Sequence, residues 1–332
     1  DMPDPQGVLV IGEITDGQLA TSSKELLAHG RALADALGEP LGIALLGDNL
    51  ADLPNEAIAA GADRAYAVTD PLLQTYQVDV YLAALHKLNE EHPPKVIILS
   101  KTPVGTEVGP RLAFRLDASL AQDCMEAEID PSTKQLTATR PVFGGNCMAK
   151  VLCEGQPMMV ILRGKTTDPL DADASRQGDV VAVSPGLDES IIKNKLIERV
   201  EEKEEGIRLE DADIVIGGGR GMGGPEPFEN ELKELADALG AAQGASRAAV
   251  DIGWVPYSYQ IGLTGKSISP SMYITVGISG ASQHLAGCSG SKVIVAINSD
   301  AEANIFKEAR YGVTGDWKVV LPAFIQQVKE LL

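Results

Sequence analysis

A glycine-rich run, residues 217–224, directly follows a predicted strand and precedes a predicted helix. Gly219, Gly221 and Gly224 fit the pattern G-x-G-x-x-G, whose backbone N–H groups can bind a nucleotide phosphate. The fork-shaped guanidinium of Arg220 also suits phosphate. The acidic residue that binds ribose about 20 residues later in dinucleotide-binding folds is missing, because that region is predicted to be helical. The run therefore indicates either an anion site or a tight turn.

Two further segments place one polar side chain among small residues. In residues 244–251, GASRAAVD, Arg247 follows only small residues, so a planar ligand could approach the backbone and meet the guanidinium. The alternative for Arg247 is an ion pair on the surface. In residues 260–266, QIGLTGK, the hydroxyl of Thr264 and nearby backbone N–H groups are possible donors. By itself, this second segment is unspecific.

The most informative segment is PSMYITVGISGASQHLAG, residues 270–287. An apolar strand, predicted at 272–276, runs into the small residues 277–281 and then into a helix. Small residues at such a turn let backbone N–H groups reach a ligand oxygen, and the helix N-terminus adds a positive partial charge. His284 lies one turn into this helix. A lone histidine is more often a core or surface residue, yet this one is the only histidine of the predicted second domain.

Residues 270–287 resemble, over nearly their whole length, the flavin signature of electron-transfer flavoprotein α subunits. The segments GASRAAVD, QIGLTGK and VAINSD occur at the spacing of that family, and TRPVFGGN (139–146) extends the resemblance to the first half of the chain. The resemblance implies that this chain pairs with a β subunit and binds one FAD in its C-terminal domain.

The resemblance also implies roles for individual residues. Arg247 is expected beside the flavin ring, Thr264 near N5 and His284 near the pyrimidine carbonyl, where a cation or donor stabilises the negative charge of the reduced flavin. Arg220 and Ser246 are expected at the phosphates. The other residues implied to bind FAD are Gln260, Ile261, Gly262, Leu263, Ser279, Gly280, Ala281, Ser282, Gln283, Asn298, Asp316 and Trp317.

Three positions depart from the family pattern. Ser282 stands where an aliphatic residue is usual, and Leu263 stands where many members have Gln. Arg310 replaces a common acidic residue, so the adenosine end of FAD is expected to be bound differently. None of the three removes a residue assigned to the flavin ring.

The composition excludes several classes of protein. The chain has 332 residues, a formal net charge of -19 and a pI near 4.6, and its basic residues are scattered. Such a surface repels nucleic acid and anionic lipid. No apolar run approaches the roughly 20 residues that span a bilayer, and the N-terminus has no signal-peptide pattern. We expect a cytoplasmic protein.

The four cysteines include no CxxC pair, and the four histidines are widely spaced. These residues therefore indicate neither a zinc site nor an iron–sulfur cluster. We expect these cysteines to be buried or functionally inactive thiols in a reducing cytoplasm. Any redox chemistry must then come from an organic cofactor.

The first half of the chain alternates apolar strands with helices, which predicts a mostly parallel sheet with helices on both faces. From residue 135 onwards, strands at 136–143, 148–152 and 158–162 are separated by turns, one of them at 144–146, and predict an antiparallel edge on the same domain. The other predicted elements are strands at 7–11, 41–46, 64–68 and 96–100 and helices at 22–37, 56–60 and 78–89.

A charged stretch, residues 193–213, indicates a connector, and we place the domain boundary inside it. Residues 1–204 are predicted to be an N-terminal α/β domain that serves as the platform for the partner subunit. Residues 205–332 are predicted to be a smaller, Rossmann-like, FAD-binding α/β domain. Its predicted elements are strands at 213–216, 273–276 and 293–297 and helices at 227–238 and 322–331.

The resemblance implies an electron carrier rather than a stand-alone enzyme. FAD on this chain would exchange single electrons with a flavin-containing dehydrogenase. One version is electron bifurcation, in which NADH reduces a second flavin on the β subunit and a ferredoxin or quinone accepts electrons. An alternative from another class is a non-redox nucleotide-binding sensor or scaffold, with a nucleotide at the glycine run or in the first domain.

Overall fold

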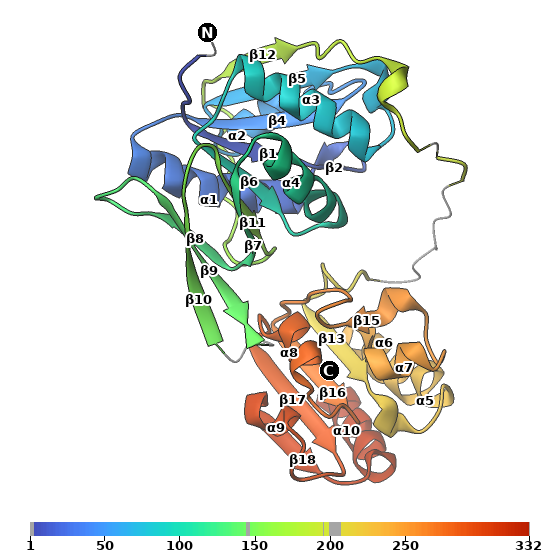
Figure 1. Ribbon diagram of the computed structural model, residues 1–332. Helices are drawn as coiled ribbons and strands as arrows, with labels where there is room; N and C mark the ends of the chain where they lie inside the picture. The colour runs from blue at the N-terminus through green and yellow to red at the C-terminus, as the bar shows by residue number, and fades with distance from the viewer. Residues whose placement is uncertain (1–2, 144–146, 195, 199–206, 332) are drawn as a thin grey trace. The chain divides into compact units, whose positions relative to one another are not determined.

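The structure is a computed structural model that describes residues 3–143, 147–194, 196–198 and 207–331. The chain divides into two compact units, residues 1–199 and 200–332 (Figure 1). The predicted boundary after residue 204 and the predicted turn at 144–146 lie outside the described residues. Each unit is an α/β structure built on its own sheet, as the sequence pattern predicts.

The N-terminal unit contains a seven-stranded sheet in which every neighbouring pair is parallel. The central strands are apolar except for Ser100 and are buried on both faces, as is typical of parallel sheets. In spatial order the strands are β12 (Asp179–Val183), β5 (Arg64–Thr69), β4 (Leu41–Gly47), β1 (Val8–Ile11), β6 (Val96–Ser100), β11 (Met158–Leu162) and β7 (Ser119–Cys124).

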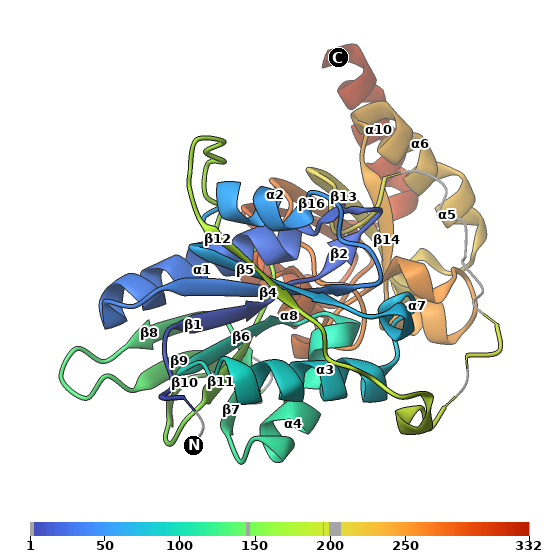
Figure 2. The same cartoon turned by 90° about the horizontal axis from the view of Figure 1, so that it is seen from above.

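Helices cover both faces of this sheet (Figure 2). Helices α1 (Thr21–Leu37) and α2 (Leu53–Ala59) pack on one face, and α3 (Val78–Glu91) and α4 (Pro103–Arg115) pack on the other. Gly38 ends α1 in the left-handed conformation, with φ of 72°, which favours glycine. The predicted parallel sheet with helices on both faces is therefore confirmed.

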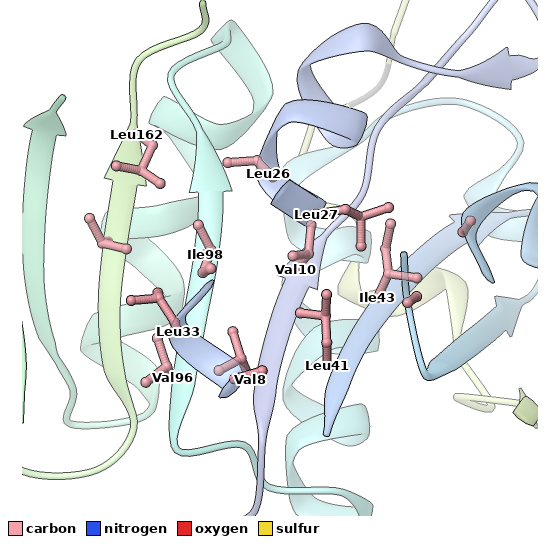
Figure 3. Packing of buried hydrophobic residues seen from close by; sticks show 14 of the residues in the cluster. Val8, Val10, Leu26, Leu27, Leu33, Leu41, Ile43, Val96, Ile98 and Leu162 are labelled. Carbon is pink, nitrogen blue, oxygen red and sulfur yellow. The ribbon is translucent and has the colours of Figure 1, made fainter. Parts of the chain in front are cut away.

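Helix α1 shows why these segments fold as they do. Leu26, Leu27 and Leu33 recur at helical spacing and point onto the buried side chains of β1 and its neighbours (Figure 3). All three side chains are at most 2% exposed. Full burial of such a side chain contributes roughly 1.5–3 kcal/mol, so α1 is held mainly by this apolar stripe.

The prediction of an antiparallel edge is partly wrong. A separate three-stranded antiparallel sheet, in the order β10-β9-β8, contains two of the three predicted strands. The third, β11, lies inside the parallel sheet between β6 and β7, because all five of its residues are apolar and need cover on both faces. The remaining strands of this unit are β2 (Ile14–Thr15), β3 (Gln18–Leu19), β8 (Glu126–Ile129), β9 (Leu136–Val142) and β10 (Cys147–Cys153).

The C-terminal unit contains a six-stranded, wholly parallel sheet. In spatial order its strands are β15 (Gln260–Ile261), β14 (Ala242–Ser246), β13 (Ile214–Gly218), β16 (Met272–Val276), β17 (Val293–Asn298) and β18 (Tyr311–Thr314).

Helices also lie on both faces of this second sheet. Instead of one helix at 227–238 there are two, which meet at Asn230. The C-terminal helix begins at Trp317 rather than at Pro322, because Asp316 caps it. The helices are α5 (Glu226–Glu229), α6 (Glu231–Leu239), α7 (Arg247–Asp251), α8 (Ser282–Cys288), α9 (Ile305–Glu308) and α10 (Trp317–Leu331).

Both sheets share one topological feature. The chain leaves the first strand of each sheet, β1 or β13, towards one side and later returns to build the other side, beginning with β6 or β16. Ligands of open α/β sheets bind outside the carboxyl ends of the strands at this switch point. A ligand is therefore expected at the carboxyl ends of β1 and β6 in the first sheet, and at the carboxyl ends of β13 and β16 in the second sheet.

Candidate functional site

The loops after β13 and β16 are in direct backbone contact. The N–H of Gly219 donates to the carbonyl of Val276 at 2.9 Å, and the N–H of Gly221 donates to the carbonyl of Gly277 at 3.1 Å. A Cβ on Gly219 would lie 2.1 Å from the oxygen of Gly277, so a side chain cannot fit there. The glycine run therefore forms a tight turn. Arg220 and Gly221 of this run also line a cavity, and the anion site stays a prediction.

The cavity at this switch point, which we call the main cavity, measures about 670 Å³. This volume lies within the roughly 300–1,000 Å³ that is usual for ligand pockets. The predicted FAD residues that line the main cavity are Arg220, Ser246, Arg247, Gln260, Ile261, Gly262, Leu263, Thr264, Ser279, Ala281, Gln283, His284 and Asn298.

A second cavity of about 310 Å³ adjoins the first, because Gly221, Gly277 and Asn298 line both. Asp316 and Trp317, predicted for the adenosine end, line this second cavity. The structure thus places these two residues beside the main cavity rather than in it.

Gly280 and Ser282 are the two predicted residues that line neither cavity. Gly280 has φ of +77°, and a Cβ there would lie 2.2 Å from the backbone nitrogen of Ile305. It is therefore needed for the close approach of two loops. The hydroxyl of Ser282 contacts the Gln283 side chain at 3.4 Å. Contacts of these two residues with FAD stay a prediction.

Arg247 is the first residue of the short helix α7 and lies at the wall of the main cavity. Its Nε donates to Oδ2 of Asp251 at 3.2 Å, and its side chain is 65% exposed. The ion pair with Asp251, which the sequence left open as an alternative, is thus present. Arg247 nevertheless also lines the main cavity. An exposed pair of this kind contributes little to stability, so the cation remains available to an anionic ligand.

Thr264 is held at the cavity by two neighbours. The amide Nε2 of the buried Gln260 donates to Oγ1 of Thr264 at 3.2 Å, and the hydroxyl of Tyr257 donates to the Thr264 backbone carbonyl. Because Oγ1 accepts the bond from Gln260, its own proton can be donated elsewhere. Thr264 can therefore act as a donor to a ligand in the cavity.

His284 is buried, and both of its ring nitrogens contact protein groups. Nδ1 lies 3.0 Å from the carbonyl oxygen of Ile261, and Nε2 lies 2.9 Å from the hydroxyl of Tyr273. Burial lowers the pKa of His284 to about 4, although the bond to Ile261 opposes this shift. His284 is therefore neutral at pH 7. Its predicted bond to the pyrimidine carbonyl stays a prediction, and it requires one of these contacts to be exchanged.

Asn298 and Asp316 brace the backbone around the adjoining cavity. Nδ2 of Asn298, the last residue of β17, donates to the carbonyl of Ile278 in the loop after β16 at 2.8 Å. Oδ1 of Asp316 accepts the N–H of Lys318 at 3.0 Å at the start of α10. Both residues therefore have a structural role besides any contact with a ligand.

Sequence reasoning missed several small or acidic residues of the main cavity. Asp251 and Asp300 lay inside segments that the resemblance had singled out, so they could have been found. Ala303 had no signal, because nothing in the sequence shows that it packs beside the switch point. The residues missed are Ala248, Asp251, Asp300 and Ala303, whereas Gly221, Gly277 and Ile278 belong to the glycine run and the turn that the sequence had indicated.

Within the part of the chain that the structure describes, no group of three or more His, Cys, Asp or Glu side chains could hold a metal ion. Among the same residues, no helix is long and apolar enough to cross a membrane. Three cysteines are buried, and Cys147 is exposed.

The fold and the site define a two-unit α/β protein with a nucleotide-sized site at the switch point of its second sheet. Two family models match it: the electron transfer flavoprotein domain over residues 8–187, and the electron transfer flavoprotein FAD-binding domain over residues 208–289. The chain belongs to the electron transfer flavoprotein α-subunit family, whose cofactor is FAD.

Relatives extend over almost the whole chain. Electron transfer flavoprotein subunit alpha of Thermoanaerobacterium thermosaccharolyticum is 42% identical and covers 99% of this chain and 100% of its own length. The subunit alpha of Megasphaera elsdenii is 40% identical, with coverage of 99% and 98%. A protein of Anaerotignum propionicum named acryloyl-CoA reductase electron transfer subunit beta is 34% identical, with coverage of 99% and 97%.

The residues present fit FAD. The two cavities share Gly221, Gly277 and Asn298 in their walls, and these glycines let an elongated ligand approach the backbone where the loops meet. Arg220 and Arg247 at the main cavity supply positive charge for a ring or a pyrophosphate.

Proposed function

We propose that this chain is the FAD-carrying subunit of an electron carrier that moves single electrons between a flavin-containing dehydrogenase and an acceptor. The observation that carries the proposal is the cavity at the β13–β16 switch point, which lies in the FAD-binding domain and has Arg247 at its wall. Bound FAD supplies the redox chemistry, and the protein supplies binding, orientation and electrostatics.

Each side of the cavity makes a different contribution. The guanidinium of Arg247 favours additional negative charge on the ligand, and Thr264 offers a hydroxyl donor. Each tenfold preference for the reduced form corresponds to about 1.4 kcal/mol. The contribution of the chain itself is then to bind the flavin and to tune it electrostatically.

The partner is proposed to be an electron-transfer flavoprotein β subunit. The subunit names of the relatives support an assembly of more than one chain. The Anaerotignum propionicum relative is named as part of an acryloyl-CoA reductase, which supports a flavoprotein acting on an acyl-CoA as the class of electron partner.

Electron bifurcation is the finer version of this proposal. It needs a second flavin on the partner subunit, NADH as the donor and a ferredoxin or quinone as a further acceptor. Counting FAD per αβ pair and testing reduction by NADH separate the versions. Two flavins with rapid reduction by NADH support bifurcation, and one flavin without such reduction supports the simple carrier.

The direct test is to purify the chain with its partner subunit and record the visible absorption of bound flavin. We expect one FAD associated with this chain and uptake of electrons in two separate one-electron steps during a reductive titration. A colourless protein that binds no added FAD would overturn the proposal and favour the non-redox sensor or scaffold.

A further inference from the structure

One buried amide side chain contacts the hydroxyl that Thr264 offers to the main cavity. Gln260, the first residue of β15, is 3% exposed, and its Nε2 donates to Oγ1 of Thr264 at 3.2 Å. Thr264 itself is exposed and lines the cavity. A buried amide thus controls an exposed hydroxyl at the wall of the proposed cofactor site.

The turn that carries Thr264 packs against the stem of Gln260. The N–H of Lys266 donates to the carbonyl of Gln260 at 2.7 Å, and the N–H of Gly265 donates to the carbonyl of Gly262 at 3.1 Å. A Cβ on Gly265 would lie 2.4 Å from the carbonyl oxygen of Gln260 and 2.8 Å from its Cγ. Gly265 lines neither the main cavity nor the adjoining one. Its lack of a side chain therefore makes room for Gln260 rather than for a ligand.

The backbone of Thr264 is held separately from its side chain. The hydroxyl of Tyr257, in the turn before β15, donates to the Thr264 carbonyl. With the backbone held, the Thr264 hydroxyl can still turn about the Cα–Cβ bond, which has three staggered positions. The bond from Gln260 selects one of these positions. Because Oγ1 accepts from Nε2, the proton of the Thr264 hydroxyl is not used by Gln260 and points elsewhere.

We propose that Gln260 is a positioning residue of the FAD site, which acts on the cofactor through the hydroxyl of Thr264. The amide of Gln260 fixes the rotamer of Thr264 and leaves the hydroxyl proton for a ligand atom that becomes more negative on reduction. Gln260 thereby favours the reduced form of bound FAD without adding charge to the site. This inference rests on the proposed FAD site.

A double-mutant cycle on the FAD-loaded complex with the partner subunit tests this indirect action. Gln260→Met removes the amide and keeps the length of the side chain, whereas Thr264→Val removes the hydroxyl and keeps the branched shape. We expect Gln260→Met to cause about a fivefold loss of preference for the reduced form, as one hydrogen bond predicts. The potential for the first electron then falls by about 40 mV, at about 59 mV per tenfold change. In the Thr264→Val background, Gln260→Met should leave the potential unchanged.

The cycle overturns the proposal if Gln260→Met shifts the potential equally in both backgrounds, or in neither. Gln243→Met is the matched control, because it removes an amide from the neighbouring strand β14, outside both cavities. Nε2 of Gln243 donates to the carbonyl of Phe228 at 2.6 Å. This variant should leave the potential unchanged. A fall as large as that in Gln260→Met would show a general effect of repacking and would also overturn the positioning role.

Nitrogen-15 NMR of the FAD-free chain separates a failure of this inference from a failure of the FAD site. The side-chain amide signals of Gln260 are those that disappear in Gln260→Met. Because Thr264→Val removes the acceptor of Nε2, we expect these signals to shift in that variant, whereas those of Gln243 stay in place. Unchanged Gln260 signals would overturn the proposal even if FAD binds.

A wild-type complex that binds no FAD, although the Gln260 signals shift in Thr264→Val, would instead overturn the proposed function, on which the role of Gln260 rests. If Gln260→Met does not fold, Gln260→Asn takes its place in the cycle and in the assignment of the signals. Its amide is one methylene shorter and cannot make the same bond to Thr264, so the same results are expected and the same results would overturn the proposal.

Discussion

The two units carry the same kind of parallel sheet, but their switch points differ. After β1 and β6, side chains bridge the two loops: Oγ1 of Thr102 donates to Oε1 of Glu13 at 2.5 Å. After β13 and β16, glycines bring the backbones together, and a cavity of about 670 Å³ lies beside them. The same topology thus gives a bridged edge in one unit and an open one in the other, according to which residues follow the strands.

The difference also concerns the charge at each edge. Burial raises the pKa of the Glu13 carboxyl, and the hydrogen bond from Thr102 partly opposes this. The C-terminal edge instead places Arg220 and Arg247 at its cavity. A buried acid repels an anionic ligand, whereas a guanidinium attracts one.

The largest effect is expected from closing the C-terminal edge with Gly219→Ala. The new Cβ would lie 2.1 Å from the oxygen of Gly277, so the loops must separate or shift. We expect FAD affinity to fall by about 100-fold or more, which corresponds to roughly 2.7 kcal/mol. The loss of FAD affinity is measured as the flavin content that remains after gel filtration. Gly164→Ala, whose Cβ would have its nearest contact at 3.6 Å, is the control; equal flavin content in both variants would contradict the account.

The next effect concerns the charge at the open edge. Arg247→Ala should lower the reduction potential for the first electron, because a cation near the flavin favours its reduced form. The side chain is 65% exposed, so solvent screening limits the change to about 30–60 mV. Arg247→Lys keeps the charge and should shift the potential less. An unchanged potential in a redox titration of Arg247→Ala would contradict the placement of Arg247 beside the flavin ring.

At the bridged edge, Glu13→Gln should make stability less dependent on pH. Because the folded-state pKa of Glu13 is raised, its unfavourable contribution is absent at low pH and appears as pH rises above 4.5 through the raised value. We expect the variant to be about 0.5–1 kcal/mol more stable at pH 7, measured by urea unfolding at several pH values. The exposed Glu154→Gln is the control. FAD binding should not change, and a loss of FAD would show that this edge contributes to the site.

The smallest effect is expected for Asp251→Asn. The change removes the negative partner of Arg247 but keeps its size, so the potential for the first electron should rise by about 10–30 mV. Added salt should reduce the difference, because exposed charges are screened. A fall in potential would mean that Asp251 acts mainly by orienting Arg247 rather than by its charge.

Much of the fold could be predicted because its signals are local. The apolar strands and the spacing of the leucines in α1 directly predict a parallel sheet with helices on both faces. The place of β11 could not be predicted, because an apolar run of five residues does not show which strands it will pair with. Likewise, only the structure shows that Asp316 caps α10 and moves its start to Trp317.

The site was predictable where the chain keeps functional residues in short segments. Arg247, Thr264 and His284, which the sequence singles out in such segments, all line the main cavity, and their contacts with FAD stay predictions. The state of His284 was not predictable, because its partner Tyr273 is eleven residues away on a strand and Ile261 lies in another segment. Hydrogen bonds between segments depend on tertiary packing, which a sequence pattern does not contain.

The central claim is that FAD binds at the open edge of the C-terminal unit. Hydrogen exchange of backbone amides, measured with and without FAD, tests it most directly. We predict protection by FAD in residues 219–223 and 277–283, and no change in residues 12–14 and 101–103. Protection at the N-terminal edge, with none at the C-terminal loops, would contradict the account.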